Sequence, residues 1–432
     1  MKKKVYIGLS IDILHHGHIN LINEAKKYGD LIVGLLTDKA IAEKKRLPLI
    51  SYNNRKKILE SINGIKKIIP QNEWSYCNNI KKIKPDFMVH GNDWKQNDLE
   101  LRSRTIKTLN QIGSKLIEIP FTKDVSSSEL NQRMMRQNML PMNRMSSLKR
   151  MLDAKKFCRI IETHSPLAAL IAENTFIQNK NGNRIEYDGF WSSSLTDSTL
   201  KGKPDIEVLE INQRLLTINE IFDVTTKPLI IDVDTGGKPE HFEINIKTLQ
   251  RSGISALIVE DKKGLKKNSL FGTDVKQEQD NINSFSKKIK IGKKISDPEF
   301  MIIARIESLI LNKPVSDAYK RANEYLSAGA DGIMIHSKKK SPSEIFKFSN
   351  LFKKKFPNVP LVSVPSSYNK VKEKDLIENG FNIVIYANHL LRASYPAMKK
   401  TALSILKNKR SFEIDNELMS IKNILELIPG TK

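Results

Sequence analysis

The chain has 432 residues, of which 39% are hydrophobic and 28% are charged, and its formal net charge is +24. At about 100–200 residues per domain, this length allows two to four domains, and the apolar fraction excludes a disordered chain. The two cysteines, Cys77 and Cys158, lie far apart in the sequence. Their spacing argues against a disulfide framework or a zinc site and favours a reducing, cytoplasmic compartment.

Strands and helices alternate through the first 120 residues. Apolar strands are predicted at residues 5–9, 31–36, 67–69, 86–90 and 115–119, with helices at about 19–28, 53–62 and 101–112. This alternation predicts a parallel, doubly wound, Rossmann-like sheet. The basic start of the chain precedes an apolar run that Asp12 and His15 interrupt, so we interpret this run as the first strand rather than a signal peptide.

A stretch rich in Met, Arg, Gln and Asn follows at residues 130–147 and contains Pro141. This composition predicts a helix end and a linker, and hence a domain boundary. We therefore expect an N-terminal domain at residues 1–134, a linker at 135–147 and a second domain at 148–432.

Eight further apolar strands are predicted in the second domain, and amphipathic segments separate most of them. They lie at residues 157–162, 186–191, 228–233, 256–260, 301–306, 332–336, 361–364 and 383–386. Eight such units predict a (β/α)₈ barrel. Charged and polar residues gather where several of these strands end, which is the rim at which barrel enzymes carry out their chemistry.

The positive charge is scattered along the chain and is not interleaved with aromatic residues. Because no nucleic-acid-binding module is visible, we favour solvated lysine-rich helix faces and expect no nucleic-acid partner. Attraction of small phosphorylated substrates is the simplest alternative use of the charge. No apolar stretch approaches the roughly 20 residues of a membrane helix, so we expect no membrane partner.

Two acids, Asp232 and Asp234, end one of the predicted barrel strands. Side chains alternate along a strand, so both acids point to the same side. With Glu260 and Asp205 they form an oxygen-rich set of the kind that Mg²⁺ prefers. Taken alone, the Asp232 segment is explained equally well as a strand-end turn with helix-capping acids.

The segment from Val259 to Ser269 leaves a strand and enters a loop full of hydrogen-bond donors. Most charge runs of this kind are solvated basic loops. Here Gly264 supplies a hinge and Asn268 with Ser269 supplies a polar tip, which favours a lid that closes over an anion.

These residues resemble the phosphoenolpyruvate mutase branch of the isocitrate lyase superfamily. That branch carries an E-D-K-x-x-x-K-x-N-S loop, which the chain matches from Glu260 to Ser269, whereas lyase members have a cysteine-containing loop that is not found here. The resemblance covers the chain from about residue 148 to the end of the barrel. Further matches are Trp191-Ser192-Ser193-Ser194-Leu195, Asp205, Asp232 with Asp234, Arg305-Ile306-Glu307 and His336-Ser337-Lys338.

The resemblance implies a Mg²⁺-dependent mutase that interconverts phosphoenolpyruvate and 3-phosphonopyruvate in phosphonate biosynthesis. It implies that Asp232 binds the metal directly, and that Asp205, Asp234 and Glu260 act through waters. The substrate-binding residues would be Trp191, Ser193, Ser194, Leu195 and Glu260, where Ser194 stands in place of a glycine of some mutases. The residues acting on the migrating phosphoryl group would be Lys266, Asn268, Arg305 and His336.

Near the N-terminus, His15-His16-Gly17-His18 opens a helix directly after the first strand. An H-x-G-H motif there places two imidazoles beside backbone N–H groups that favour phosphate, and Gly17 permits a phosphate to approach the backbone closely. A histidine-containing helix cap explains this tetrapeptide equally well on its own.

The N-terminal domain resembles the glycerol-3-phosphate and ethanolamine-phosphate cytidylyltransferases across about residues 4–134. The matching segments are His15 with His18, Ser51–Lys56, His90-Gly91-Asn92-Asp93-Trp94 and Val125-Ser126-Ser127-Ser128. The resemblance implies that His15 and His18 stabilise attack of a phosphate oxygen on the α-phosphate of CTP. It implies that Gly17, Lys44, Arg55, Ser126, Ser127 and Ser128 bind the nucleotide.

The two resemblances together predict a bifunctional enzyme of phosphonate metabolism, a homo-oligomer through its barrel, whose N-terminal domain transfers CMP from CTP to a phosphonate. A barrel hydrolase or lyase acting on a 2-oxo acid is an alternative, which Lys266 and Asn268 disfavour. Phe121 and Asp124 replace an arginine and a glycine of the cytidylyltransferase pattern. These replacements leave open an N-terminal domain that only binds nucleotide.

Overall fold

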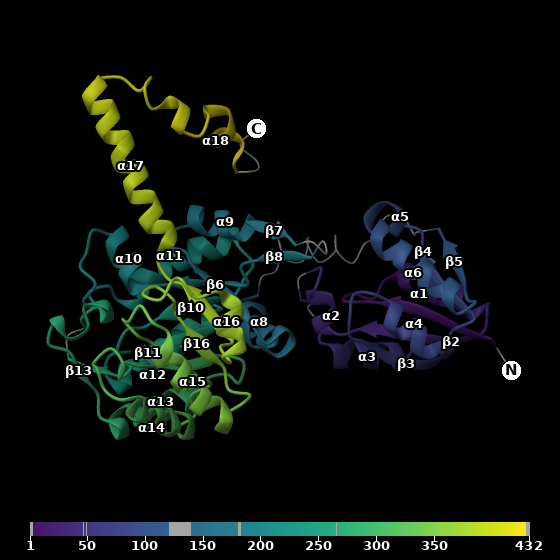
Figure 1. Ribbon diagram of the computed structural model, residues 1–432, viewed down its shortest axis with the longest axis horizontal. Coiled ribbons are helices and arrows are strands. Elements are labelled where there is room, and N and C mark those ends of the chain that lie inside the picture. The colour runs from purple at the N-terminus through teal and green to yellow at the C-terminus, as the bar shows by residue number, and fades with distance from the viewer. Residues whose placement is uncertain are drawn as a thin grey trace.

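The structure is a computed structural model that describes residues 3–45, 47–48, 50–120, 140–179, 183–264 and 266–428. It contains a small parallel α/β sheet domain followed by a larger closed barrel (Figure 1). The predicted fold class, a Rossmann-like domain joined to a (β/α)₈ barrel, is therefore confirmed.

The N-terminal domain is built on a five-stranded parallel sheet in the order β3-β2-β1-β4-β5. Its strands are β1 (Lys4–Leu9), β2 (Asp30–Leu36), β3 (Ile65–Gln71), β4 (Phe87–Gly91) and β5 (Lys115–Ile119). Its helices are α1 (His16–Lys26), α2 (Asp38–Ala42), α3 (Tyr52–Glu60), α4 (Cys77–Ile83), α5 (Trp94–Asn97) and α6 (Leu99–Gln111).

Strand β1 shows why this sheet is covered on both faces. Val5 and Ile7 pack into one apolar cluster with residues of α1 and α3, whereas Tyr6 between them packs into a second cluster with α4 and α6. The strand order reverses between β1 and β4, and ligands of such sheets bind in the crevice at the carboxyl ends of the strands there. The H-x-G-H motif follows β1 and therefore borders this crevice.

The barrel closes with eight parallel strands in the order β10-β11-β14-β15-β16-β17-β6-β9. These strands are β6 (Cys158–Glu162), β9 (Gly189–Ser192), β10 (Leu229–Asp232), β11 (Ala256–Glu260), β14 (Met301–Ile306), β15 (Gly332–Ile335), β16 (Leu361–Ser363) and β17 (Ile383–Tyr386). All eight predicted strands are present, and the predicted strand at 186–191 is confined to β9.

Helices cover the outside of the barrel (Figure 1). They are α8 (Pro141–Lys155), α9 (Pro166–Asn174), α10 (Ser194–Leu200), α11 (Ile211–Val224), α12 (Pro239–Arg251), α13 (Ile282–Ile295), α14 (Val315–Ser327), α15 (Ser343–Lys355) and α16 (Glu373–Glu378). Helix α8 begins at Pro141, so the last residues of the segment predicted as a linker are helical. Proline suits this first position because its missing N–H would have no partner there.

Two short hairpins were not predicted from the sequence. One joins β7 (Phe176–Gln178) and β8 (Arg184–Glu186), and the other joins β12 (Lys262–Lys263) and β13 (Glu278–Gln279). The segment predicted as a lid lies between β12 and β13, and its last residue, Ser269, begins the short 3₁₀ helix η1 (Ser269–Asp274). The second hairpin therefore anchors both ends of the lid to the barrel.

The pleat of the strands explains how polar residues reach the barrel mouth. Along β10, Ile230 lies in the interior apolar layer, and Asp232 is two residues further on the same side. The same spacing relates Ile258 to Glu260, Ile303 to Arg305, and Met334 to His336. The interior is thus apolar below and charged at its carboxyl rim.

The chain leaves the barrel after β17 through α17 (His389–Asn408), which extends away from the barrel, followed by η2 (Asp415–Glu417) and α18 (Ile421–Glu426) (Figure 1). None of the 20 residues of α17 is buried, and Tyr395, Met398 and Leu406 are among its exposed apolar residues. Within the described ranges, no helix has the length and apolarity needed to cross a membrane.

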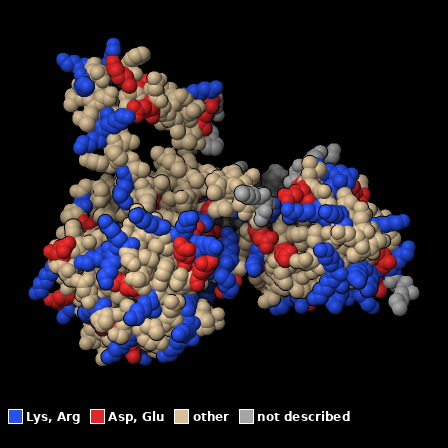
Figure 2. Space-filling view, viewed as in Figure 1, with Lys and Arg blue, Asp and Glu red and all other residues tan. Residues whose placement is uncertain are grey.

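Lysine and arginine side chains gather along the edge of the N-terminal domain formed by α3 and β3, and are mixed with acids over the visible face of the barrel (Figure 2). Cys77 and Cys158 are both free, and Cys158 is buried.

Candidate functional site

Three carboxylates converge at the carboxyl rim of the barrel. One oxygen from each of Asp232, Asp234 and Glu260 lies within 4.8 Å of the others, the one such group of metal-binding type found among the described residues. All three side chains are buried, and neither carboxylate oxygen of Glu260 accepts a hydrogen bond within the described structure. A buried, all-oxygen set of this kind fits a hard divalent cation such as Mg²⁺.

The turn after β10 sets the direction of these acids. Asp234 has a left-handed backbone (φ 54°), a conformation that a short polar side chain tolerates better than most, and Gly236 and Gly237 continue the turn with φ values of 74° and 68°. The backbone N–H of Asp234 donates to Oδ1 of Asp232 at 3.0 Å. The turn therefore holds the two carboxylates of the D-x-D segment together.

Lys266 reaches from the lid into this carboxylate cluster. Its ammonium donates to Asp205 at 3.0 Å, also contacts Asp234, and lies 4.0 Å from Glu260. The same nitrogen donates to the hydroxyl of Ser194. The lid is thus closed onto the acids, and Lys266 links Asp205 to the carboxylate cluster.

Asn268 lies at the tip of the lid and has two different contacts. Its Nδ2 donates to Oδ2 of Asp205 at 2.8 Å, and its Oδ1 accepts from the backbone N–H of Leu270 at 3.0 Å, which caps η1. Burial alone would raise the pKa of Asp205, but Lys266 and the hydrogen bond from Asn268 bring it below its ordinary value. Asp205 is therefore held as a carboxylate by the closed lid.

Arg305 connects the acids to the far wall of the site. Its Nη1 lies 3.0 Å from Glu260, its Nε donates to Glu307 at 2.7 Å, and its Nη2 donates to Ser269 of the lid at 2.6 Å. The same Nη2 lies 3.2 Å from Nδ1 of His336. A guanidinium only donates, so Nδ1 accepts and the imidazole proton resides on Nε2.

Charges and burial set the protonation of this wall. Burial, reinforced by Arg305, lowers the pKa of His336 to about 3, so the ring is neutral at pH 7. Burial raises the pKa of Asp232 to about 6, although Lys266 opposes the rise. A bound cation would favour the ionised form of Asp232 further.

The remaining predicted substrate residues form the opposite wall. Trp191, Ser193, Ser194 and Leu195 line a cavity of about 60 Å³, whose other lining residues include Asp205, Asp232, Glu260, Lys266, Asn268, Arg305 and His336. Nε1 of Trp191 is buried and has no hydrogen-bond partner among the described residues. The structure thus brings the predicted barrel residues to one small cavity, except Asp234, which does not line it but joins the carboxylate cluster and contacts Lys266.

In the N-terminal domain, the H-x-G-H motif caps helix α1 with both histidines. Nδ1 of His15 accepts from the N–H of Gly17 at 3.2 Å, and Nδ1 of His18 accepts from the N–H of His15 at 3.4 Å. The two rings lie 3.9 Å apart. Because both Nδ1 atoms accept, the Nε2 atoms carry the protons on the opposite edge of each ring, so the cap and a phosphate-binding role are compatible.

Both imidazoles are kept neutral. Burial lowers the pKa of His15, with a smaller effect of His16, and burial lowers the pKa of His18 to about 3, assisted by His15 and Lys45. The lysine within electrostatic reach of the motif is therefore Lys45, which was not predicted from the sequence. The predicted phosphate ligand was Lys44, the residue that precedes Lys45. A lysine next to a predicted phosphate ligand was the available signal for Lys45.

Arg55 does not reach the histidines as a free cation. Its side chain is fully buried, and it donates to the carbonyls of Ser10 and Ile50 and to Asp38 at 2.6 Å. These contacts hold the loop after β1 in place. Sequence matching to an arginine-bearing helix start could not show this, because the acceptors come from distant segments.

Two other predicted features of this domain have different outcomes. In the H-G-N-D-W segment after β4, the His90 and Trp94 rings stack at 3.8 Å. The predicted nucleotide ligands Ser126, Ser127 and Ser128, and the departures Phe121 and Asp124, lie outside the described residues.

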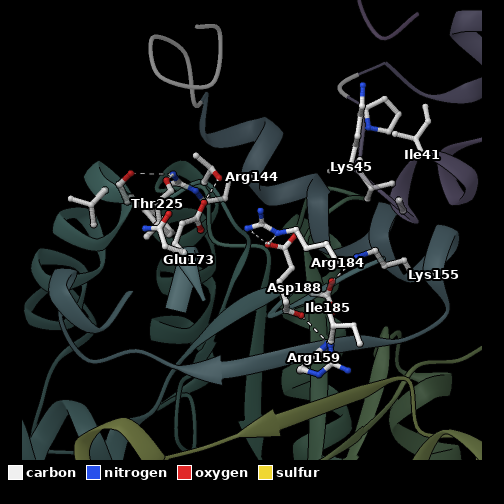
Figure 3. Close-up of a pocket in the computed structure, with 18 of the residues that line it drawn as sticks. Ile41, Lys45, Arg144, Lys155, Arg159, Glu173, Arg184, Ile185, Asp188 and Thr225 are labelled. Carbon is white, nitrogen blue, oxygen red and sulfur yellow. Dashed lines mark hydrogen bonds and ion pairs between the residues drawn. The ribbon is translucent and has the colours of Figure 1, made fainter. Parts of the chain in front are cut away.

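A larger cavity of about 1930 Å³ lies at the other end of the barrel (Figure 3). Ile41 and Lys45 of the N-terminal domain line one side, and Arg159 and Arg184 of the barrel line the other. Three of the barrel cations that line it are paired with acids: Lys155 with Asp188, Arg159 with Glu373, and Arg184 with Glu186. This cavity is remote from the carboxylate rim.

Comparison with known proteins assigns both domains. The phosphoenolpyruvate phosphomutase family model matches residues 148–406, and the cytidylyltransferase-like model matches residues 6–133. The N-terminal domain is 41% identical over 97 residues to a glycerol-3-phosphate cytidylyltransferase of Bacillus spizizenii, covering 22% of this chain and 74% of the relative.

Relatives of the barrel include two different activities. A phosphoenolpyruvate phosphomutase of Tetrahymena pyriformis is 34% identical over 284 residues, which cover 65% of this chain and 90% of the relative. A phosphonopyruvate hydrolase of Variovorax sp. is 33% identical over 289 residues, which cover 66% and 95%. A solved phosphonopyruvate hydrolase in complex with oxalate and Mg²⁺ has a TM-score of 0.57 at 32% identity, covering 66% of this chain and 94% of that structure.

The family matches agree with the folds of the two domains. The chain is an enzyme that belongs to the phosphoenolpyruvate phosphomutase family and carries an N-terminal cytidylyltransferase-like domain.

Proposed function

We propose that the barrel interconverts phosphoenolpyruvate and 3-phosphonopyruvate. The observation that carries this proposal is the closed lid, whose Lys266 contacts Asp234 of the carboxylate cluster and whose Asn268 donates to the neighbouring Asp205. Arg305 and His336 line the same cavity. Hydrogen-bond donors therefore line the cavity in which the anionic phosphoryl group would migrate.

The donors of the site suit the charge that develops in such a reaction. Phosphoryl migration passes through a pyruvate enolate and a metaphosphate-like group, both of which are anionic. The guanidinium of Arg305 and the neutral Nε2–H of His336 can restrain the phosphoryl group without giving up a proton. Lys266 would exchange a carboxylate contact for a phosphoryl contact when substrate enters.

The metal proposal rests on the donor set. Asp232 would bind Mg²⁺ directly, with Asp205, Asp234 and Glu260 acting through waters, and the bound ion would supply Lewis-acid stabilisation of the enolate oxygen. The two oxygens of Glu260 are ion-paired with Arg305 and Lys262 but accept no hydrogen bond within the described structure, which fits a role toward such waters. The solved phosphonopyruvate hydrolase in complex with oxalate and Mg²⁺ supports Mg²⁺ as the ion.

Phosphonopyruvate hydrolysis is the alternative, because a phosphonopyruvate hydrolase is almost as similar to the barrel as the mutase is. The two activities differ in whether water reaches the phosphoryl group. In the closed state, Ser269 donates to Glu307 at 2.6 Å and accepts from Lys262 and Arg305, which closes the lid over the cavity. A lid held over the cavity in this way limits the access of water, which favours phosphoryl transfer over hydrolysis.

We also propose that the N-terminal domain transfers CMP from CTP to a phosphonate and releases pyrophosphate. Two neutral imidazoles with their Nε2–H groups on the outer edge can donate to a phosphate as charge develops on it. The position of the motif at the reversal of strand order supports nucleotide binding there. The association with a mutase barrel supports a phosphonate as acceptor.

The transfer proposal is tested by incubating the full chain with CTP and either 2-hydroxyethylphosphonate or 2-aminoethylphosphonate. We expect pyrophosphate release and a CMP-phosphonate in equal amounts. Nucleotide binding without pyrophosphate release, for every nucleotide and phosphonate tried, would instead support the binding-module alternative.

We further propose a homo-oligomer formed through the barrel, located in a reducing, cytoplasmic compartment. Helix α17 buries none of its residues within one chain although it carries large apolar side chains. Light scattering of the purified chain would show a mass that is a multiple of 49.3 kDa. A monomer at all accessible concentrations would contradict the proposal.

A further inference from the structure

Arg214 lies behind the barrel site, and no role was predicted for it from the sequence. Each of its three side-chain nitrogens donates a hydrogen bond. It lies on α11, is 2% exposed, and is absent from the described residues that line the small active-site cavity. Burying a guanidinium is costly unless all its donors find acceptors. The position of those acceptors therefore indicates what Arg214 does.

All three nitrogens of Arg214 bond to parts of the catalytic rim. Nε donates to Oδ2 of Asp197 at 2.8 Å, and Nη2 donates to both the carbonyl and the hydroxyl of Ser192, at 3.1 and 3.0 Å. Nη1 donates to the backbone carbonyl of Asp232. Ser192 in turn donates to the same oxygen of Asp197 at 2.7 Å, which completes a closed network.

The three acceptor residues belong to the separate elements that build the site. Ser192 ends β9 immediately before the substrate-side residues Ser193 and Ser194, and Asp197 lies on α10, which Ser194 begins. Asp232 ends β10 and carries the carboxylate proposed to bind the metal. Arg214 thus joins the substrate-binding turn to the metal-binding strand from behind.

We propose that Arg214, with Asp197, is a positioning residue that fixes the substrate-binding turn relative to the metal carboxylate. It acts through its neighbours, since it is not among the described residues that line the cavity and it bonds to the backbone carbonyl of Asp232 rather than to its carboxylate. A displacement of either element would change the distance between the metal ligand and the residues around Ser194. The inference rests on the barrel chemistry proposed above.

The planar fork of arginine is essential to this role. A guanidinium can donate in three directions at once, whereas the ammonium of lysine is a point charge on a flexible stem. Lysine at position 214 could pair with Asp197, but it could not also hold the carbonyls of Ser192 and Asp232. Arg214→Lys therefore keeps the buried charge pair with Asp197 and removes the hydrogen bonds to the carbonyls of Ser192 and Asp232.

The test uses the full chain and measures Mg²⁺ binding, and then oxalate binding in saturating Mg²⁺, by calorimetry. Loss of a group that orients metal ligands typically costs about 10- to 100-fold in affinity. We expect Arg214→Lys to weaken Mg²⁺ and oxalate binding in that range, in addition to the fall in melting temperature that any loss of buried hydrogen bonds produces. In steady-state kinetics, kcat should fall more than KM rises.

Arg144→Lys is the matched control. Arg144 is 3% exposed on α8 and donates to the carbonyls of Phe222 and Thr225, before the opposite end of β10. Its substitution should lower the melting temperature without reducing the affinity for Mg²⁺ or for oxalate. Equal loss of ligand affinity in the two variants would make the effect one of general stability and would overturn the proposal.

Wild-type affinity for both ligands in Arg214→Lys would also overturn the proposal. If Arg214→Lys does not fold, Asp197→Asn provides the test, because it retains a side-chain oxygen as acceptor but loosens α10. Reduced oxalate affinity in Asp197→Asn would support the proposal, and unchanged affinity would refute it. Because binding is measured without turnover, failure of the mutase proposal appears separately, as a wild-type chain that binds both ligands but forms no phosphoenolpyruvate.

Discussion

Asn268 provides the sharpest test of the lid, because its two contacts separate two roles. The amide Nδ2 donates to Asp205 at 2.8 Å, and the amide Oδ1 caps η1 through Leu270 at 3.0 Å. Asn268→Ala removes both contacts. Asn268→Asp keeps an oxygen for the cap but replaces the donor with a second carboxylate that faces Asp205.

The magnitudes of the two losses differ enough to be distinguished. A lost helix cap costs about 1 kcal/mol of local stability. A lost donor that acts mainly in the transition state costs about 10²–10³ in kcat. If the amide acts on the phosphoryl group, both variants should therefore lose about 10²–10³ in kcat with little change in KM, and a looser lid should raise the share of pyruvate and phosphate among the products.

Asn281→Ala is the matched control for the cap. Asn281 caps α13 by accepting from the N–H of Asn283 at 2.8 Å, and it is not among the described residues that line the active cavity. It should retain wild-type turnover. Steady-state kinetics on phosphonopyruvate with product analysis measures all three variants. Near-wild-type turnover and unchanged products in Asn268→Ala would refute a catalytic role for the lid tip.

Three further outcomes are expected. Asp232→Ala should abolish Mg²⁺ binding in calorimetry while pyrophosphate release by the N-terminal domain persists; loss of both with a cooperative drop in melting temperature would indicate a structural role instead. His18→Ala should reduce pyrophosphate release by about 10² or more and leave the barrel activity unchanged, and unchanged release would remove the histidines from the chemistry. His336 is neutral when folded, with a pKa of about 3, but titrates near 6.5 when unfolded, so its stabilising effect is complete above pH 6.5 and is lost as the pH falls toward 3. At pH 5 this loss is about 2 kcal/mol, so denaturant unfolding should show a steeper decline below pH 6.5 for the wild type than for His336→Asn, and parallel curves would contradict it.

The fold was predictable because the hydrophobic pattern of each strand survives in the structure. The short apolar runs of the second domain became eight barrel strands, and the D-x-D pair fell at the rim because side chains alternate from Ile230 to Asp232. The convergence of Asp232, Asp234 and Glu260 follows from the same geometry. Strand pattern and strand ends therefore predicted both the architecture and where its acids meet.

Contacts between distant segments could not be predicted in the same way. Arg55 matched a phosphate-binding position, yet its donors are taken by Ser10, Ile50 and Asp38. Arg214 is an ordinary polar residue of a helix in the sequence, and only the packing of α11 behind β9 and β10 gives it a role. Side-chain partners of this kind depend on tertiary packing, which periodicity does not encode.

Phosphorus NMR of the purified chain with 3-phosphonopyruvate and Mg²⁺ tests the central claim most directly. The account predicts that the phosphonate resonance converts to the phosphate-ester resonance of phosphoenolpyruvate, and that this conversion stops when Mg²⁺ is chelated. Conversion to inorganic phosphate alone, from the first time point onward, would contradict a mutase and assign the barrel to hydrolysis.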